Sequence, residues 1–354
     1  MNRRALMVAA TTLGLFAGAA TAQDSLPPLD SDSEPDRIEW WQLEAEFGPL
    51  PAPTESVRIG AVAKTLINEY WRSLGEGYQK LADAVGVQLT LQAAQNESDQ
   101  LGQLSIAETM LLEGYNVLLV SPQSDANLIP AVEQADELGV PVVNVNDAVI
   151  ATARNYVGNV QRDNGVRAAR WFIENVPGGG KVAVVEGQPG VYAARQRTDG
   201  FVSTISAESD GFEVVASVPG NWDRQLSFDI ASTIMQQYPD LVGFYANNDG
   251  MALGIVEAVK AEDLLDQIAV IGTDGISDAY ASIQAGELTA TVDSFPVLTG
   301  EVAAEVALRL LAGQDLPRVV ATPQALISLD NYERYKGAGA DVRAVLIEDA
   351  TAAQ

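Results

Sequence analysis

Short apolar runs alternate with longer amphipathic segments from Val57 onward. Strands that are buried on both faces form continuous apolar runs, whereas helices that cover a sheet have one apolar stripe. The alternation is therefore typical of repeated βαβ units and of a largely parallel sheet. Strands are predicted at 57–63, 87–92, 116–120, 141–145, 181–186, 212–218, 241–246, 267–271 and 289–293.

The amphipathic segments between these runs are predicted to be helices. Nine strands are more than one compact open sheet of this chain length needs. The Pro177-Gly-Gly-Gly180 turn also follows a predicted helix near the middle of the chain. We therefore expect an α/β protein with two doubly wound parallel-sheet lobes. Its helices include 69–85, 126–138, 193–206, 251–261 and 297–311.

The two ends of the chain do not follow this alternation. Residues 1–22 have a basic start, a short apolar run and an Ala-Thr-Ala end, which together predict a cleaved signal peptide and a periplasmic protein. Residues 23–56 are acidic and rich in proline, and we expect an extension that is mostly coil. Residues 336–354 are expected to be a C-terminal tail.

The charge and the missing residue types exclude several functions. The chain has 21 Lys and Arg against 48 Asp and Glu, a net charge of −27, which repels nucleic acid and favours a soluble monomer. It has no histidine and no cysteine, so the usual zinc ligands and the histidine-dependent nucleophile systems are missing. We expect neither an enzyme nor a bound cofactor or metal. Gly178-Gly-Gly-Lys181 lacks the spacing of a phosphate-binding loop, and we interpret it as a turn.

Polar side chains follow two of the predicted strands. Asn248 comes just after 241–246, and Asp274 follows 267–271. The carboxyl ends of parallel strands face the crevice where such sheets bind ligands, and amide and carboxylate groups suit hydroxyl-rich molecules. Each residue also has a structural explanation, because Asn248 can cap a helix and Asp274 before a glycine is typical of a turn.

With these motifs, residues from about Val57 to about Gly313 resemble the periplasmic sugar-binding proteins of ABC transporters, in the ribose-binding-like group of the type I fold. The resemblance implies two lobes joined by three crossover segments, with a sugar held between them. It places the N-terminal lobe at 57–159 plus 295–320. The C-terminal lobe is then 160–294 plus 321–335.

The resemblance also assigns candidate ligand contacts. Asn68 matches a residue that hydrogen-bonds a sugar hydroxyl, and Tyr70 and Trp71 match two aromatic residues that stack on one sugar face. Trp222 matches the aromatic residue on the opposite face, and Arg197 matches a guanidinium of the second lobe. The aromatic residues could instead belong to the core or cap a loop. Arg197 could pair with a surface carboxylate, and Arg195 is an equally placed competitor.

Asn248 and Asp274 match the amide and the carboxylate that the family pairs in its site, but two other positions depart from its pattern. The family's Asp-Arg after the fourth strand is replaced by Asn146-Asp147, which argues against ribose itself. The polar residue where the chain recrosses the hinge, often glutamine, is Ser294.

Two functions remain as hypotheses. The first is a receptor that holds a sugar or polyol between aromatic rings and polar rim groups, and delivers it to the membrane permease of an ABC transporter. The second is a sensor, because Trp40-Trp-Gln-Leu-Glu-Ala45 and Tyr70-Trp71 look like the trimethylamine-N-oxide-sensing periplasmic proteins that signal to a histidine kinase. In that case the four aromatic side chains would form a cation–π cage. A DNA-binding repressor is excluded by the export signal and the acidic charge.

Overall fold

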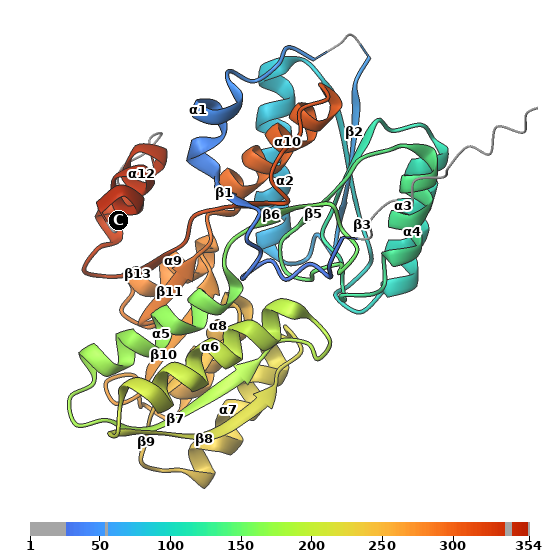
Figure 1. Ribbon diagram of the computed structural model, residues 1–354. Helices are drawn as coiled ribbons and strands as arrows, with labels where there is room; N and C mark the ends of the chain where they lie inside the picture. The colour runs from blue at the N-terminus through green and yellow to red at the C-terminus, as the bar shows by residue number, and fades with distance from the viewer. Residues whose placement is uncertain (1–25, 54–55, 337–341, 353–354) are drawn as a thin grey trace, which may run out of the picture.

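The computed structural model describes residues 26–53, 56–336 and 342–352, and the predicted signal peptide lies outside them. The described residues form two sheets, one above the other in Figure 1. The first sheet has seven parallel strands. Their order is β1 (Arg37–Glu39), β12 (Val319–Ala321), β6 (Asn155–Gly158), β5 (Val142–Val145), β4 (Val117–Val120), β2 (Arg58–Ala63) and β3 (Gln88–Ala93).

The second sheet has six strands, and its edge strand β13 runs antiparallel to its neighbour β11. The other strands of this sheet are parallel. The order is β13 (Ala325–Ser328), β11 (Ala290–Asp293), β10 (Ala269–Asp274), β9 (Leu241–Ala246), β7 (Gly180–Glu186) and β8 (Phe212–Pro219).

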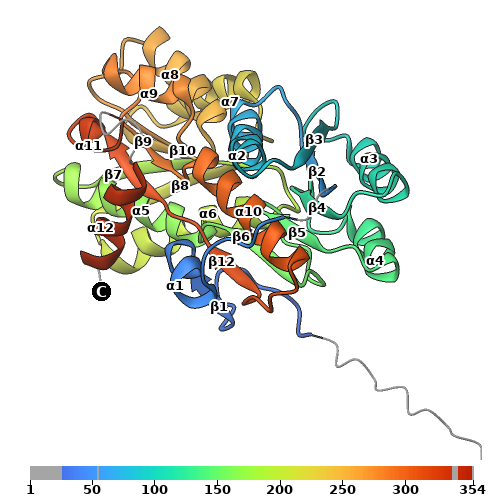
Figure 2. The same ribbon diagram turned by 90° about the horizontal axis from the view of Figure 1, so that it is seen from above.

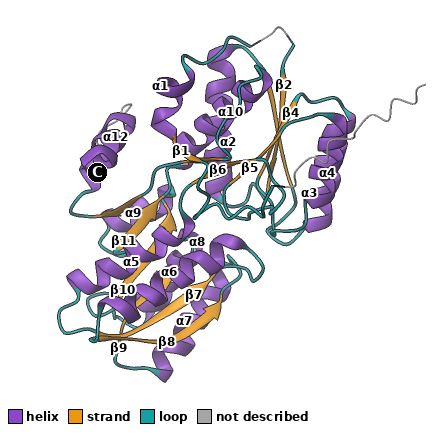
Figure 3. Ribbon diagram, in the orientation of Figure 1, coloured by secondary structure: helices purple, strands orange, loops and turns teal. Residues whose placement is uncertain are grey.

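Helices cover both faces of each sheet, as Figure 3 shows. In the first lobe these are α2 (Glu69–Val85), α10 (Pro296–Leu311), α3 (Gln100–Leu112) and α4 (Ile129–Leu138). In the second lobe they are α5 (Gln161–Asn175), α6 (Tyr192–Glu208), α7 (Arg224–Gln237), α8 (Asp249–Ala261) and α9 (Ser277–Gln284). The predicted fold class, two doubly wound parallel-sheet lobes, is confirmed.

The chain passes between the lobes three times, and the lobes overlap in the view from above (Figure 2). It crosses after β6, after β11 and after β12. Each crossing therefore joins a strand of one sheet to an element of the other lobe. The carboxyl ends of the strands from both sheets bring their loops to the boundary between the lobes.

The extension that was expected to be coil is partly ordered. Its residues form β1, a single 3₁₀ turn η1 (Trp40–Gln42) and α1 (Leu43–Phe47). Ile38, Trp40 and Leu43 are buried, so these short elements are held by packing against the first lobe. The C-terminal residues likewise form α11 (Tyr332–Lys336) and α12 (Val342–Ala352). No helix of the described residues is both long enough and apolar enough to span a bilayer.

The close packing of α2 on α10 generates a stability prediction. A Cβ atom added at Gly77 would lie 2.0 Å from the carbonyl oxygen of Val297, which is backbone and cannot rotate away. Gly77→Ala should therefore push the helices apart and lower the free energy of unfolding by about 1–3 kcal/mol. Chemical denaturation measures the change. Glu76→Ala, at an exposed position of the same helix, should stay within about 0.5 kcal/mol of the wild type, and equal stability of both variants would contradict the prediction.

Candidate functional site

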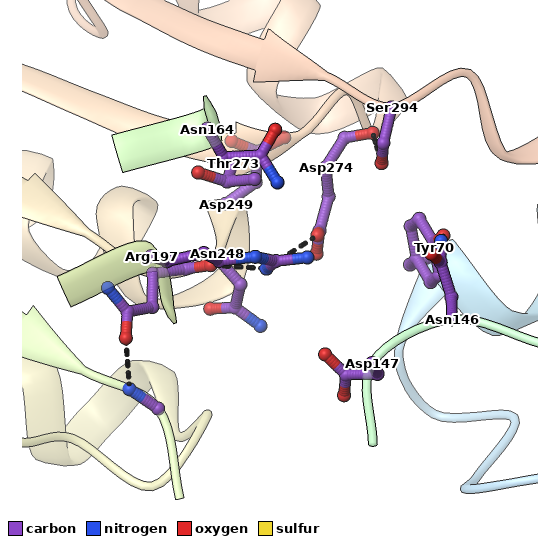
Figure 4. Close-up of polar contacts among 12 residues, drawn as sticks. Tyr70, Asn146, Asp147, Asn164, Arg197, Asn248, Asp249, Thr273, Asp274 and Ser294 are labelled. Carbon is purple, nitrogen blue, oxygen red and sulfur yellow. Dashed lines mark hydrogen bonds and ion pairs between the residues drawn. The ribbon is translucent and has the colours of Figure 1, made fainter. Parts of the chain in front are cut away.

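A narrow cavity lies between the two lobes. Its lining comes from both sheets, and Figure 4 shows part of it. Nine of the ten residues predicted from the sequence line this one cavity. The lining residues are Asn68, Tyr70, Trp71, Glu97, Asn146, Asp147, Arg197, Trp222, Asn248 and Asp274.

Two asparagine side chains cap helices at the edge of the cavity. The Oδ1 atom of Asn68 accepts a hydrogen bond of 3.0 Å from the backbone N–H of Tyr70 at the start of α2. Asn248 accepts in the same way from the N–H of Met251, at 2.9 Å. A capping asparagine uses its oxygen, and its NH₂ group stays available as a donor. The capping role and the ligand-binding role of these residues are therefore compatible.

Aromatic rings reach the cavity from both lobes. Tyr70 and Trp71 begin α2, are almost fully buried, and their ring centroids lie 4.8 Å apart in an edge-to-face arrangement. The indole N–H of Trp71 donates to Glu97 at 3.1 Å, and the Tyr70 hydroxyl accepts from the amide of Asn146. Trp222 enters from the loop before α7 in the second lobe. The three rings thus surround a shared space, and hydrogen bonds hold the two rings of the first lobe.

Four lining residues have an unusual backbone conformation. The φ angles are 49° at Asn146, 61° at Asp147, 63° at Trp222 and 132° at Asp274. Positive φ is uncommon for residues other than glycine and is least favourable for bulky side chains such as tryptophan. Such conformations cost about 1–3 kcal/mol each and persist only where the surroundings impose them, often at ligand sites.

The guanidinium of Arg197 is held by three partners, two of them shown in Figure 4. Its Nε donates to the Gln161 side chain at 2.9 Å, and its Nη1 donates to the Asn247 carbonyl at 2.6 Å. Nη1 also lies 3.4 Å from a carboxylate oxygen of Asp274. Arg195, its competitor on sequence grounds, forms an ion pair with Asp125 and is largely exposed. The structure therefore brings Arg197, and not Arg195, into the cavity.

Two charged residues of the site, Lys64 and Glu97, were not predicted from the sequence. Lys64 is buried, forms an ion pair with Asp147, and its ammonium lies 5.5 Å from the Trp71 ring centroid and 5.6 Å from that of Trp222. Glu97 lines the cavity directly. Lys64 follows β2 and Glu97 lies in the loop after β3. A search for polar residues after every predicted strand, and not only after two of them, finds both.

Burial changes the acidity of the carboxyl groups. Burial raises the pKa of Asp274 well above its usual value, while the Arg197 guanidinium opposes the rise. Burial also raises the pKa of Glu97, which Lys64 partly offsets. The Oε2 atom of Glu97 and the indole nitrogen of Trp222 are buried with no partner among the described residues. The site therefore presents one unpaired acceptor and one unpaired donor.

Asp249 supports the loop that carries Asp274. Its carboxylate accepts from the N–H groups of Gly275 and Ile276 at 2.8 and 3.1 Å, and from the Thr291 hydroxyl at 2.6 Å. Burial raises the pKa of Asp249 to about 6.

Two sequence-based expectations differ from the structure. Ser294 does not line the cavity, because its hydroxyl lies behind it, 3.5 Å from the backbone oxygen of Asp274. Trp40 and Trp41 do not line the cavity either, and the Trp40 ring centroid lies 5.5 Å from the guanidinium carbon of Arg343 in α12. The four-ring aromatic cage is therefore not assembled. Within the described residues, no cluster of three carboxylates suits a metal ion.

The model of the periplasmic binding protein domain matches residues 59–315. The chain belongs to this family. The ribose import binding protein RbsB of Bacillus subtilis is 34% identical over 76% of this chain and 86% of its own length. A D-ribose/D-allose-binding protein of Pseudomonas aeruginosa is 31% identical, covering 80% of this chain and 94% of that protein.

Among solved structures, a solute-binding protein of an ABC transporter from Actinobacillus succinogenes, with bound D-allose, superposes with a TM-score of 0.76. It is 28% identical and covers 79% of this chain and 100% of that one. The predicted resemblance to sugar-binding proteins of ABC transporters is confirmed. Nothing in these comparisons supports the hypothesis of an amine-oxide sensor.

Asp249 generates a prediction about pH. Its folded-state pKa of about 6 lies above the 3.8 of an ordinary carboxyl, so its contribution to stability is fully present below that lower value and is lost as the pH rises through about 6. Asp249→Asn keeps the shape, and its amide can donate to Thr291 while its oxygen accepts both N–H groups. Between about pH 5 and about pH 7, the wild type should lose about 1 kcal/mol of unfolding free energy relative to the variant. Urea titrations measure the unfolding free energy of both proteins across this pH range. The same pH dependence in the wild type and in Asp249→Asn would show that Asp249 does not titrate within the range.

Proposed function

We propose that this protein is a periplasmic receptor that binds a neutral sugar or polyol between its lobes and delivers it to the permease of an ABC transporter. The observation that carries the proposal is the convergence of nine predicted ligand residues, from both lobes, on one cavity. The family and its named relatives support transport over sensing.

The chemistry of the cavity suits a polyhydroxylated ring. Sugar faces present C–H groups, which stack on aromatic rings, and hydroxyls project from the edge toward polar side chains. Trp71 and Trp222 provide rings from the two lobes, and Arg197 with Asp274 provides donors and acceptors between them. The unpaired Glu97 oxygen and Trp222 nitrogen can each be satisfied by one ligand hydroxyl. A ligand without these hydroxyls would leave them unpaired.

Two observations rank the candidate sugars. Curated relatives are named for D-ribose and for D-allose, and the similar solved structure contains D-allose. In this chain Asn146-Asp147 replaces the Asp-Arg of the ribose-binding pattern, and the cation on that side of the site is Lys64. We therefore place a hexose such as D-allose ahead of D-ribose.

The wider properties follow from the same proposal. The receptor acts without catalysis or a cofactor, works in the periplasm as a monomer, and has no nucleic-acid partner. Ligand contacts made by both lobes exist only when the lobes are closed, so the sugar favours that state by its differential affinity. The closed receptor is then the form that the permease recognises.

Removing Arg197 tests the site directly. Arg197→Ala leaves the buried Asp274 carboxylate without its cation, and we expect the dissociation constant for D-allose to rise at least 100-fold. Isothermal titration with D-allose, D-ribose and myo-inositol measures it, and trimethylamine N-oxide serves as the ligand of the rejected hypothesis. The matched control is Arg170→Ala, an exposed arginine of the same lobe. Wild-type protein that binds no sugar or polyol contradicts the proposed function.

The position of the Trp222 ring depends on Gly187. A Cβ atom at Gly187 would lie 2.0 Å from Cη2 of Trp222, so Gly187→Ala should displace the ring from the cavity. Loss of one stacking face should weaken sugar binding roughly tenfold or more. Gly211→Ala is the control, because the nearest atom to its new Cβ is 3.6 Å away. Unchanged affinity in Gly187→Ala would mean that Trp222 does not stack on the ligand.

A further inference from the structure

An N-terminal arm, residues 26–36, precedes the region matched by the family model and is anchored to the first lobe. The N–H of Leu29 donates to the carbonyl of Ala151 at 2.8 Å. The buried guanidinium of Arg318 donates to the carbonyl of Pro27 at 2.7 Å and forms an ion pair with Glu34 at 3.1 Å. These contacts fix the arm along the first lobe immediately before β1.

The same arm contacts the second lobe through two aspartates. The carboxylate of Asp32 accepts from the backbone N–H groups of Gln161 and Arg162, at 3.0 and 2.7 Å. Asp30 accepts from the hydroxyl of Tyr192 at the start of α6. Val160, which precedes α5, provides no side-chain cap. Asp32 therefore satisfies the first N–H groups of α5 from a distant part of the chain, and its charge suits the positive end of that helix.

Gln161 connects this contact to the ligand site. Its Oε1 atom accepts from Nε of Arg197 at 2.9 Å, and its Nε2 atom donates to Asn146 at 3.2 Å and to Asn159 at 2.8 Å. Arg197 belongs to the second lobe and Asn146 to the first, and both line the cavity. The side chain of Gln161 thus joins cavity residues of the two lobes, while Asp32 accepts a hydrogen bond from the backbone N–H of the same residue.

We propose that the N-terminal arm is a latch that holds the two lobes closed over the ligand, with Asp30 and Asp32 as its positioning residues. The effect on affinity rests on the proposed sugar-binding function. A ligand binds with an apparent affinity reduced by the fraction of molecules that are in the competent state. No residue of the arm lines the cavity, so weakening the arm lowers affinity by depopulating the closed state and speeds ligand release.

The test replaces the two carboxylates by amides. In Asp30→Asn/Asp32→Asn, we expect the dissociation constant for D-allose to rise about tenfold, mainly through faster dissociation. Tyr192→Phe removes a single hydroxyl outside the cavity and should weaken binding in the same direction by a smaller factor. Glu44→Gln/Glu46→Gln is the matched control, because it makes the same two carboxylate-to-amide changes at exposed positions of α1, outside the arm. Its affinity should stay within about twofold of the wild type.

A second measurement needs no ligand. The chain has no cysteine, so spin labels at Ser98→Cys and Gln225→Cys, exposed positions where the two lobes meet at the cleft mouth, report the lobe separation alone. The distance distribution of the unliganded Asp30→Asn/Asp32→Asn protein should shift to longer distances, and that of Glu44→Gln/Glu46→Gln should match the wild type. Identical distributions in all three proteins, or an equal shift in Glu44→Gln/Glu46→Gln, would overturn the latch. Wild-type protein that binds no sugar refutes the proposed function, whereas the distances still decide the latch.

If the double variant fails to fold, as judged by circular dichroism, Tyr192→Phe carries the same two measurements. In that variant, unchanged affinity and unchanged distances together would overturn the latch.

Discussion

The constraint that shapes this protein is that charges buried in the cleft need partners within their own lobe. Lys64 and Asp147 pair in the first lobe, and Arg197 and Asp274 pair in the second. Separating a buried ion pair costs several kcal/mol, because each charge is left uncompensated until water reaches it. Since neither pair spans the cleft, the lobes can open without breaking one. Opening and closing therefore depend on hydrogen bonds, apolar contacts and the partly exposed ion pair of Arg195 with Asp125, which are individually weaker.

Under the proposed function, the same arrangement favours a neutral guest over an ion at these two pairs. Lys64, Asp147, Arg197 and Asp274 are already neutralised by one another, so a ligand ion would disturb a satisfied pair before gaining a partner. A hydroxyl both donates and accepts, and it can bond to these groups without changing their charge. The positive φ angles of lining residues add to this selectivity, because they fix polar groups and one aromatic ring in position before the ligand arrives.

Much of the scaffold could be predicted from the sequence, because long elements carry a clear period. Helix α2 has the predicted bounds 69–85, and β9 has the predicted bounds 241–246. The strands β1, β6, β12 and β13, of three or four residues each, were missed, whereas the four-residue strands β4, β5 and β11 were predicted, so a short run of residues alone does not decide whether a strand forms. Most of the site followed from resemblance and from polar residues at strand ends. Its ion pairs depend on which strand ends face each other, which spacing along the chain does not encode.

The parts outside the family match can influence the energetics of the cavity without lining it. The core from 59 to 315 builds the cavity, whereas the N-terminal arm and α12 attach at the boundary of the lobes. Arg343 of α12 pairs with Glu301 of α10 in the first lobe, although α12 follows the second lobe's β13 and α11 in the chain. Both terminal segments therefore tie the lobes together without touching the ligand. Changes in these segments can alter the free energy of closure, and hence affinity, while the contacts that define ligand identity stay the same.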